Sequence, residues 1–117
     1  MLGKQNILVL KEVFVNVRSS DLDKLLESMQ KILSLSLRIN KSLGADSNFI
    51  ATLAGKLAHP LPLVRVNLLK TINVMLLKSA DPKTFLKTHN LRKSVKKIAK
   101  EDSSIMVRQM ANTLLKA

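Results

Sequence analysis

The sequence predicts an all-α fold, a right-handed superhelix of stacked helical repeats with about two and a half repeats and six or seven helices. Apolar residues make up 46% of the 117 residues, and they are long aliphatic side chains with only three Phe. The chain has three Gly and three Pro, too few for the turns of an all-β fold. Aliphatic stripes at helical spacing recur at an offset of 43 positions, which indicates a repeat.

The whole chain, residues 1–117, is predicted to be a single helical-repeat domain, with repeats at about 1–43, 44–88 and 89–117. The first segment, about residues 4–17, has apolar residues all around the helical wheel, which predicts a helix buried on several sides. A strand is the alternative, because β-branched residues are abundant in this segment. The predicted helices cover about residues 4–17, 21–42, 47–57, 62–79, 82–88, 91–100 and 104–116.

Helix starts are marked by polar residues and prolines. Ser20 with Asp23 resembles a capping box, and Asp46 or Ser47 is expected to begin the third helix. Pro62 suits the first turn of the fourth helix, which carries apolar residues on two sides and should be the most enclosed. Asp81-Pro82 begins the fifth helix. Asn90 is expected to cap the sixth, and Ser103 or Ser104 the last.

The repeat is visible in the second half of the chain. Val64-Arg65 matches Val107-Arg108, and Leu68 matches Ala111, each at an offset of 43. A further step of 43 back from Leu68 reaches Leu25, in the apolar stripe of the second helix. Three helices therefore begin near residues 20, 62 and 104, and a period of about 40–47 residues is the spacing of armadillo and HEAT arrays.

The segment from Asp102 to Leu115 resembles a HEAT-type motif. The resemblance implies that Arg65 and Arg108 are arginines of a buried charged ladder, in which each meets an aspartate of an adjoining repeat, and that Asp102 is an acceptor. His59 stands where the family has Asp, so the ladder is expected to be incomplete in the middle repeat. The first repeat lacks both residues.

Residues 59–117, about half of the chain, also resemble the non-catalytic armadillo-like tail of septation-initiation (mitotic-exit) protein kinases and their plant epsilon-class relatives. This resemblance rests on Leu63-Val64-Arg65-Val66-Asn67-Leu68-Leu69-Lys70 and on the run from Val107 to Ala117. It implies a fragment that docks or localises a serine/threonine kinase, in the cytoplasm at the spindle pole or division site. The three glycines cannot form a phosphate-binding loop. The sequence also contains neither the His-Arg-Asp motif nor the Asp-Phe-Gly motif of protein kinases.

Charge gives the main functional hint. The formal net charge is +12, and residues 60–117 carry twelve Lys or Arg against three Asp or Glu. A cluster on the helices around residues 82–100 is the predicted partner-binding patch for an acidic or phosphorylated protein; a solvated helix face is the alternative. Its members are Lys83, Lys87, Arg92, Lys93, Lys96, Lys97 and Lys100.

The function expected from these features is non-catalytic protein–protein scaffolding, with possible partners also including a second copy docked through residues 4–17. The alternative is a basic module that binds nucleic acid or anionic lipid, although Phe14, Phe49 and Phe85 are the only aromatic residues available for base stacking. Without cysteine, and with His59 and His89 far apart, we expect no catalytic, cofactor or metal site. No apolar run is long enough for a membrane span, and a soluble, cytosolic or nuclear protein is expected.

Overall fold

The computed structural model describes residues 11–14, 16–18, 21–79 and 81–116, and all regular elements in these ranges are helices. Residues 11–14 are helical, so the described part of the first segment is not a strand; residues 4–10 lie outside the described ranges. The all-α prediction is confirmed for the described residues. The helices with complete bounds are α2 (Leu22–Leu35), α3 (Leu37–Gly44), α4 (Ser47–Lys56), α5 (Pro62–Leu77), α6 (Pro82–Thr88), α7 (Leu91–Glu101) and α8 (Ile105–Leu115).

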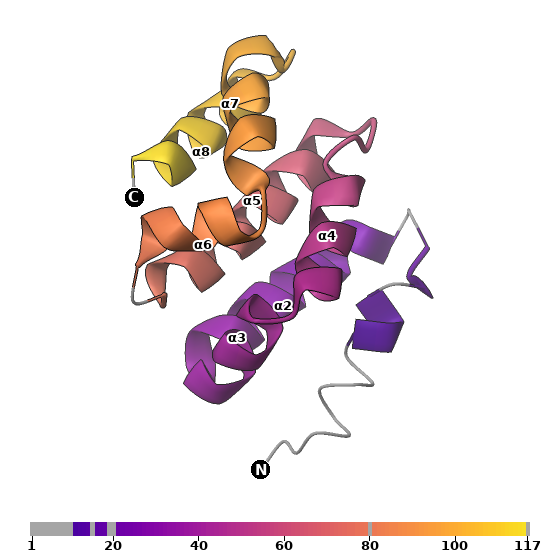
Figure 1. The fold of residues 1–117 in the computed structure, drawn as a ribbon. Helices are drawn as coiled ribbons and strands as arrows, with labels where there is room; N and C mark the ends of the chain where they lie inside the picture. The colour runs from indigo at the N-terminus through magenta and orange to yellow at the C-terminus, as the bar shows by residue number, and fades with distance from the viewer. Residues whose placement is uncertain (1–10, 15, 19–20, 80, 117) are drawn as a thin grey trace.

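Helix α5 is the centre of the molecule. It packs against α2 on one side and α8 on the other, and it also contacts α3, α4 and α6 (Figure 1). It is the most enclosed of the described helices, as predicted, because its apolar residues spread around the whole helix and each side meets a neighbour. Its buried residues are Val64, Val66, Asn67, Leu68, Leu69, Thr71, Ile72, Met75 and Leu76.

The helices that begin at Leu22, Pro62 and Ile105 are neighbours in that order, since α5 lies between α2 and α8. The starts of α5 and α8 are 43 residues apart, which equals the offset of the sequence pattern. The remaining helices pair with this row: α3 packs against α2, and α7 packs against α8. Aliphatic stripes that recur in the sequence are therefore buried against one another.

The single helix predicted over 21–42 is wrong: the structure has two helices there, which adds one helix to the predicted number. Ser36 is in an extended conformation (φ −122°, ψ 102°), and its hydroxyl accepts a hydrogen bond from the Ile39 amide at 3.2 Å. Ser36 thus caps α3. A buried side chain stabilises the break, because the Asn40 amide group donates to the Leu33 carbonyl at 3.1 Å and to the Val74 carbonyl of α5 at 3.3 Å.

Most of the predicted helix starts are confirmed. The side chains of Asp46, Asp81 and Ser104 each accept a hydrogen bond from the amide three residues later. Pro62 is in the first turn of α5. The capping box predicted from Ser20 and Asp23 is wrong, because the N-cap of α2 is Asp21, which makes no side-chain cap bond. Asn90 holds the predicted N-cap position of α7, but its side chain makes no cap bond either.

The described part of the first segment packs onto α4. Phe14 is fully buried, its ring lies 5.2 Å from that of Phe49 between centroids, and the Lys56 ammonium lies 5.5 Å from the Phe14 centroid. These contacts bury one side of the segment inside the same chain. Val13 is half exposed. Dimerisation through residues 4–17 stays a prediction, since residues 4–10 lie outside the described ranges.

A candidate basic docking groove

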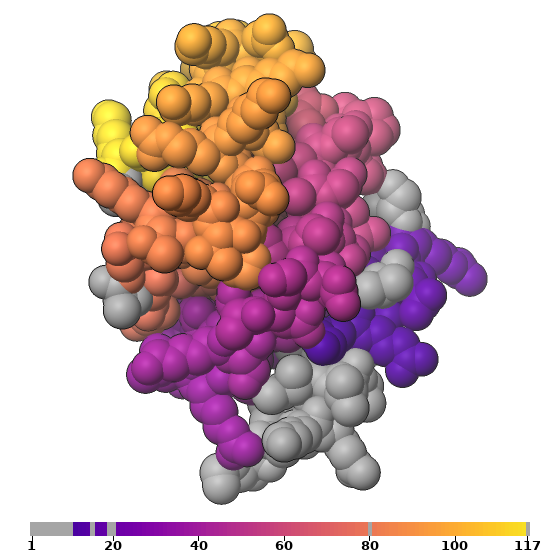
Figure 2. All heavy atoms as spheres, viewed as in Figure 1, coloured from indigo at the N-terminus to yellow at the C-terminus, as the bar shows by residue number. Residues whose placement is uncertain are grey.

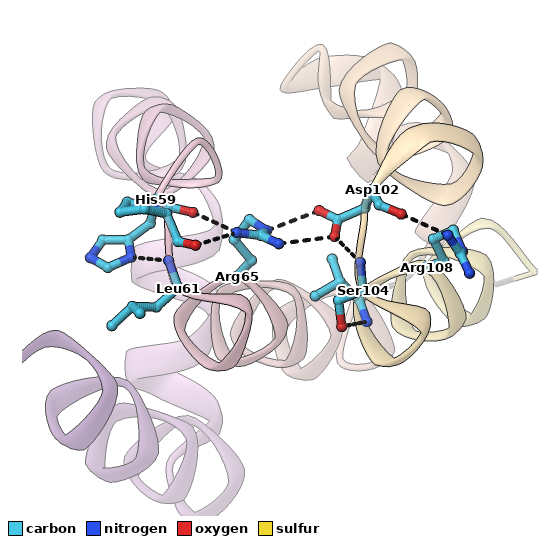
Figure 3. A network of polar contacts seen from close by, with 8 residues as sticks. His59, Leu61, Arg65, Asp102, Ser104 and Arg108 are labelled. Atoms are coloured by element: carbon cyan, nitrogen blue, oxygen red, sulfur yellow. Dashed lines mark hydrogen bonds and ion pairs between the residues drawn. The ribbon is translucent and has the colours of Figure 1, made fainter.

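Arg65 and Asp102, two of the three residues assigned to a ladder, form a bidentate ion pair. The Arg65 Nε lies 2.9 Å from Asp102 Oδ2, and Arg65 Nη2 lies 3.0 Å from Asp102 Oδ1 (Figure 3). Their side chains are only 11% and 8% exposed. The pair joins the start of α5 to the turn before α8, so it fixes two neighbouring helices of the row relative to each other.

The same polar geometry occurs twice, 43 residues apart (Figure 3). Arg65 Nη1 donates to the His59 carbonyl at 2.9 Å, and Arg108 Nη1 donates to the Asp102 carbonyl at 2.8 Å. The His59 ring Nδ1 accepts from the Leu61 amide at 3.1 Å, as the Asp102 carboxylate accepts from the Ser104 amide at 2.9 Å. His59 is thus a turn residue whose ring is bonded to the backbone.

The ladder does not extend to Arg108. Lys11–Asp46 and Arg65–Asp102 are the ion pairs in the described part of the chain, and Arg108 binds a carbonyl oxygen rather than a carboxylate. The expected role of Arg108 as a ladder arginine is therefore met only by its backbone contact. Arg65 pairs with Asp102, which lies in the turn before α8. Arg108 contacts the same residue, but through its carbonyl oxygen.

Burial tends to raise the pKa of the Asp102 carboxyl, yet its pKa lies below the ordinary value of 3.8. The hydrogen bonds from Arg65 and from the Ser104 amide outweigh burial, helped by the positive charges of Arg65 and Arg108. Asp102 is accordingly ionised at neutral pH. This network connects α5 to the C-terminal end of α7, and α7 carries part of the basic surface described next.

Helices α6 and α7 are fastened to the scaffold by buried side chains and by one histidine. Leu86, Leu91 and Val95 are buried in the core. The His89 Nε2 lies 2.8 Å from the Gly44 carbonyl oxygen at the end of α3, so this nitrogen carries the proton and donates. The chain then turns at Asn90, the only described non-glycine residue with positive φ (54°), a conformation that Asn tolerates.

The turn between α6 and α7 creates an open groove of about 680 Å³. Both helices face the viewer in Figure 2, where their orange atoms form one side of the molecule. Leu86 contributes an apolar wall and Asn90 lies at the turn, while five exposed cations surround them. These cations are Lys83, Lys87, Arg92, Lys93 and Lys96.

Five of the seven residues of the predicted patch line this groove, and Lys97 and Lys100 do not. Lys97 lines a different hollow, between α4 and α7, together with Glu101 and Asp102. Lys100 is exposed but lines neither hollow. The reason is the helical twist, since positions 93, 96 and 97 of one helix diverge around its circumference. The sequence did not predict that Leu86 and Asn90 line the groove. The available signals were the helical spacing of Leu86 and the position of Asn90 just before a helix.

No carboxylate neutralises the groove from within, since residues 82–100 contain seven Lys or Arg and no Asp or Glu. Asp81, at the start of α6, is the acidic residue beside Lys83. Its pKa is lowered by hydrogen bonds from the Thr84 hydroxyl and the Thr84 amide. The Asp81 carboxylate caps α6 and keeps its charge, but the seven Lys and Arg of residues 82–100 outnumber it, so the groove has a positive potential.

We also searched the structure for metal sites and membrane-spanning helices and compared the chain with known proteins. In the ranges that the structure describes, no three His, Cys, Asp or Glu residues gather in a way that could hold a metal ion. None of the helices searched in those ranges has the length and apolar character to cross a membrane. Comparisons of the chain with protein-family models, with curated proteins and with solved structures return no match. What the groove can bind is therefore inferred from its own residues.

Proposed function

We propose that this chain is a non-catalytic protein-interaction module that binds an acidic or phosphorylated segment of a partner protein in the groove between α6 and α7. The observation that carries the proposal is the convergence of five exposed cations on one groove whose lining contains no carboxylate. Lys and Arg side chains arranged in this way bind carboxylate and phosphate groups through charge-assisted hydrogen bonds.

The apolar part of the groove favours a peptide over a simple counter-ion. Leu86 is buried at the base of the groove, and the exposed methylene stems of Lys83 and Lys87 beside it supply a surface for an aliphatic side chain of the partner. The side chains of Lys83 and Lys87 come from α6, whereas Arg92, Lys93 and Lys96 come from α7. A segment lying along the groove would contact cations on both sides.

The proposed architecture is an armadillo- or HEAT-like right-handed superhelix, and the twofold occurrence of the arginine–carbonyl geometry supports it. In arrays of this kind, each repeat contributes a face to one extended binding surface. The resemblance to the tail of septation-initiation kinases adds a proposal about context: the module docks or localises such a kinase in the cytoplasm, at the spindle pole or division site.

Electrostatic attachment to nucleic acid or anionic lipid is the second candidate, since the same cations attract phosphate groups. The described aromatic residues do not favour single-strand binding. Phe14 and Phe49 are buried, and the ring of Phe85 packs against His89 with centroids 4.9 Å apart. Bases would find no exposed aromatic platform among the described residues.

The test is a binding titration with a fluorescent acidic peptide that contains phosphoserine. Wild-type chain is compared with the triple variant Lys87→Glu/Lys93→Glu/Lys96→Glu, all in the groove. We expect affinity to fall by about a hundredfold, because each reversal replaces an attraction with a repulsion of similar size. The control variant Lys24→Glu/Lys41→Glu/Lys116→Glu changes net charge equally at exposed positions elsewhere.

If both triple variants lose affinity alike, net charge rather than the groove determines binding, and the proposal is wrong. Duplex DNA and vesicles containing phosphatidylserine are titrated in parallel, at several salt concentrations. Tighter binding to either of these than to the peptide, with loss in the groove variant, would establish the second candidate instead.

A further inference from the structure

Ser94 is an exposed serine on α7, next to the basic groove. It lines the hollow between α4 and α7 together with Lys97. Its hydroxyl has no hydrogen-bond partner among the described residues, whereas the hydroxyls of Thr84, Ser104 and Thr113 serve internal hydrogen bonds. The Ser94 Oγ is therefore an accessible nucleophile that the fold does not use.

The charge around Ser94 is unlike that around the other exposed serines. In sequence, Arg92 and Lys93 precede it and Lys96 and Lys97 follow it. The hollow that it lines also holds Glu101 and Asp102, and the Asp102 carboxylate is already paired with Arg65. By comparison, Ser47 follows Asp46 and Ser103 follows Asp102. Protein kinases select substrates partly by charge pattern, and one with an acidic substrate groove would attract a serine with cations on both sides.

The first turn of α7 is weakly held by local interactions, and Ser94 is the fourth residue of that helix. Asn90 makes no side-chain cap bond, and no acidic residue lies in the first turn. Arg92 and Lys93 are there instead, where positive charge opposes the helix dipole. Like charges four residues apart add repulsion. Leu91 and Val95 anchor the turn in the core, and a local opening of the turn would present Ser94 in an extended segment.

We propose that Ser94 is a phosphorylation site for a serine/threonine kinase that selects basic residues. The Ser94 Oγ attacks the γ-phosphorus of Mg–ATP, and the bond from that phosphorus to the bridging oxygen of ADP breaks. The hydroxyl proton passes to a carboxylate of the kinase, and ADP leaves. The products are phospho-Ser94 and Mg–ADP.

The consequence rests on the function proposed above. Phosphorylation adds a charge of about −1.5 to −2 beside Lys93, Lys96 and Lys97. The phosphate competes with an acidic partner for these cations and repels it. Because Lys97 lines the same hollow as Ser94, it is placed to pair with the phosphate. Phosphorylation of Ser94 thus releases a partner from the groove.

The experiment treats the full chain with the purified catalytic domain of a basic-residue-selective kinase and Mg–ATP. Intact mass and peptide mapping then locate the phosphate. We expect one phosphate on Ser94, none in Ser94→Ala, and unchanged labelling in the control Ser42→Ala. Ser42 is also exposed, but it has nearby basic residues only on its N-terminal side. Lys93→Glu/Lys96→Glu should lose labelling, because the charges that attract the kinase are reversed.

The phosphorylated chain is then titrated with an acidic peptide that contains no phosphate. Affinity is expected to fall by about tenfold relative to the unmodified chain. Labelling of Ser42 or another residue with Ser94 unmodified overturns the site, and labelled Ser94 with unchanged affinity overturns the switch. A failure of the docking proposal is distinguishable, because the unmodified chain would then bind no peptide while mass analysis still reports on Ser94.

Discussion

At the scale of single residues, His59 and Asp102 show how two different side chains solve the same problem. Each accepts the amide two residues later, and each offers its carbonyl to an arginine six residues later. Asp102 also forms the bidentate ion pair with Arg65 of α5. A histidine and an aspartate thus form the same turn at positions 43 residues apart.

Removal of one partner from the Arg65–Asp102 pair should destabilise the protein. We expect Arg65→Gln to lower the free energy of unfolding by about 3 kcal/mol, because it leaves the largely buried Asp102 carboxylate without its bidentate partner. Arg65→Lys should recover only part of this, since a single ammonium cannot match the planar fork. Urea denaturation of both variants and of Asp102→Asn in a double-mutant cycle measures the coupling. Additive losses would show that the pair contributes nothing.

The lowered pKa of Asp102 predicts a dependence of stability on pH. Because the folded-state pKa lies below the ordinary value of 3.8, the unfolded chain binds more protons in acid. The stabilisation that ionised Asp102 contributes is therefore fully present above pH 3.8 and is lost as the pH falls through the folded-state pKa. Thermal melts from pH 6 downwards should show a shallower acid slope for Asp102→Asn than for wild type. Equal slopes would assign the acid sensitivity to Asp46 and Asp81, whose pKa values are also lowered.

At the scale of elements, the break at Ser36 has two supports of different kinds. The Ser36 hydroxyl caps the new helix, and Asn40 takes the Leu33 carbonyl, which would accept from residue 37 in an uninterrupted helix. The break leaves Leu35 87% exposed, a cost in apolar burial that these hydrogen bonds offset. Two short helices can then follow the surface of α5 where one straight helix would leave it.

Asn40→Ala should destabilise this corner selectively. We expect a loss of about 1–3 kcal/mol, because the Leu33 and Val74 carbonyls lose their buried donor. The exposed Asn48→Ala in α4 is the matched control and should change stability by less than about 0.5 kcal/mol. Chemical denaturation measures both, and hydrogen exchange should report faster opening at the α2–α3 junction. An effect no larger than that of the control would mean that water satisfies these carbonyls.

At the scale of the whole molecule, α5 is the element on which the others depend, since it contacts five of the described helices. Leu68→Ala should lower the free energy of unfolding by about 2–5 kcal/mol, because the fully buried side chain leaves a cavity. Leu63→Ala, in the same helix but 52% exposed, should have an effect of less than about 0.5 kcal/mol. Far-ultraviolet circular dichroism should report one cooperative transition. Hydrogen exchange that shows α2 opening before α8 would mean that the repeats unfold separately.

Several features of the fold and of the candidate site were readable from sequence. The apolar stripes at an offset of 43 predicted the helices that begin at Pro62 and Ile105, and Asp46 and Ser104 were identified as caps, because these patterns arise from local backbone geometry. The excess of Lys and Arg near the C-terminal end indicated a basic surface, because charge needs no tertiary structure to be counted.

Tertiary structure alone decided which of those residues act together. Arg65 finds Asp102 only because α8 packs beside α5, and Asn40 reaches Val74 only because α3 folds back onto α5. Lys97 is separated from the groove by its angular position on α7, while Lys83 and Lys87 join it from another helix. Sequence specifies contacts within about one helical turn, whereas contacts between helices depend on packing angles that no single segment encodes.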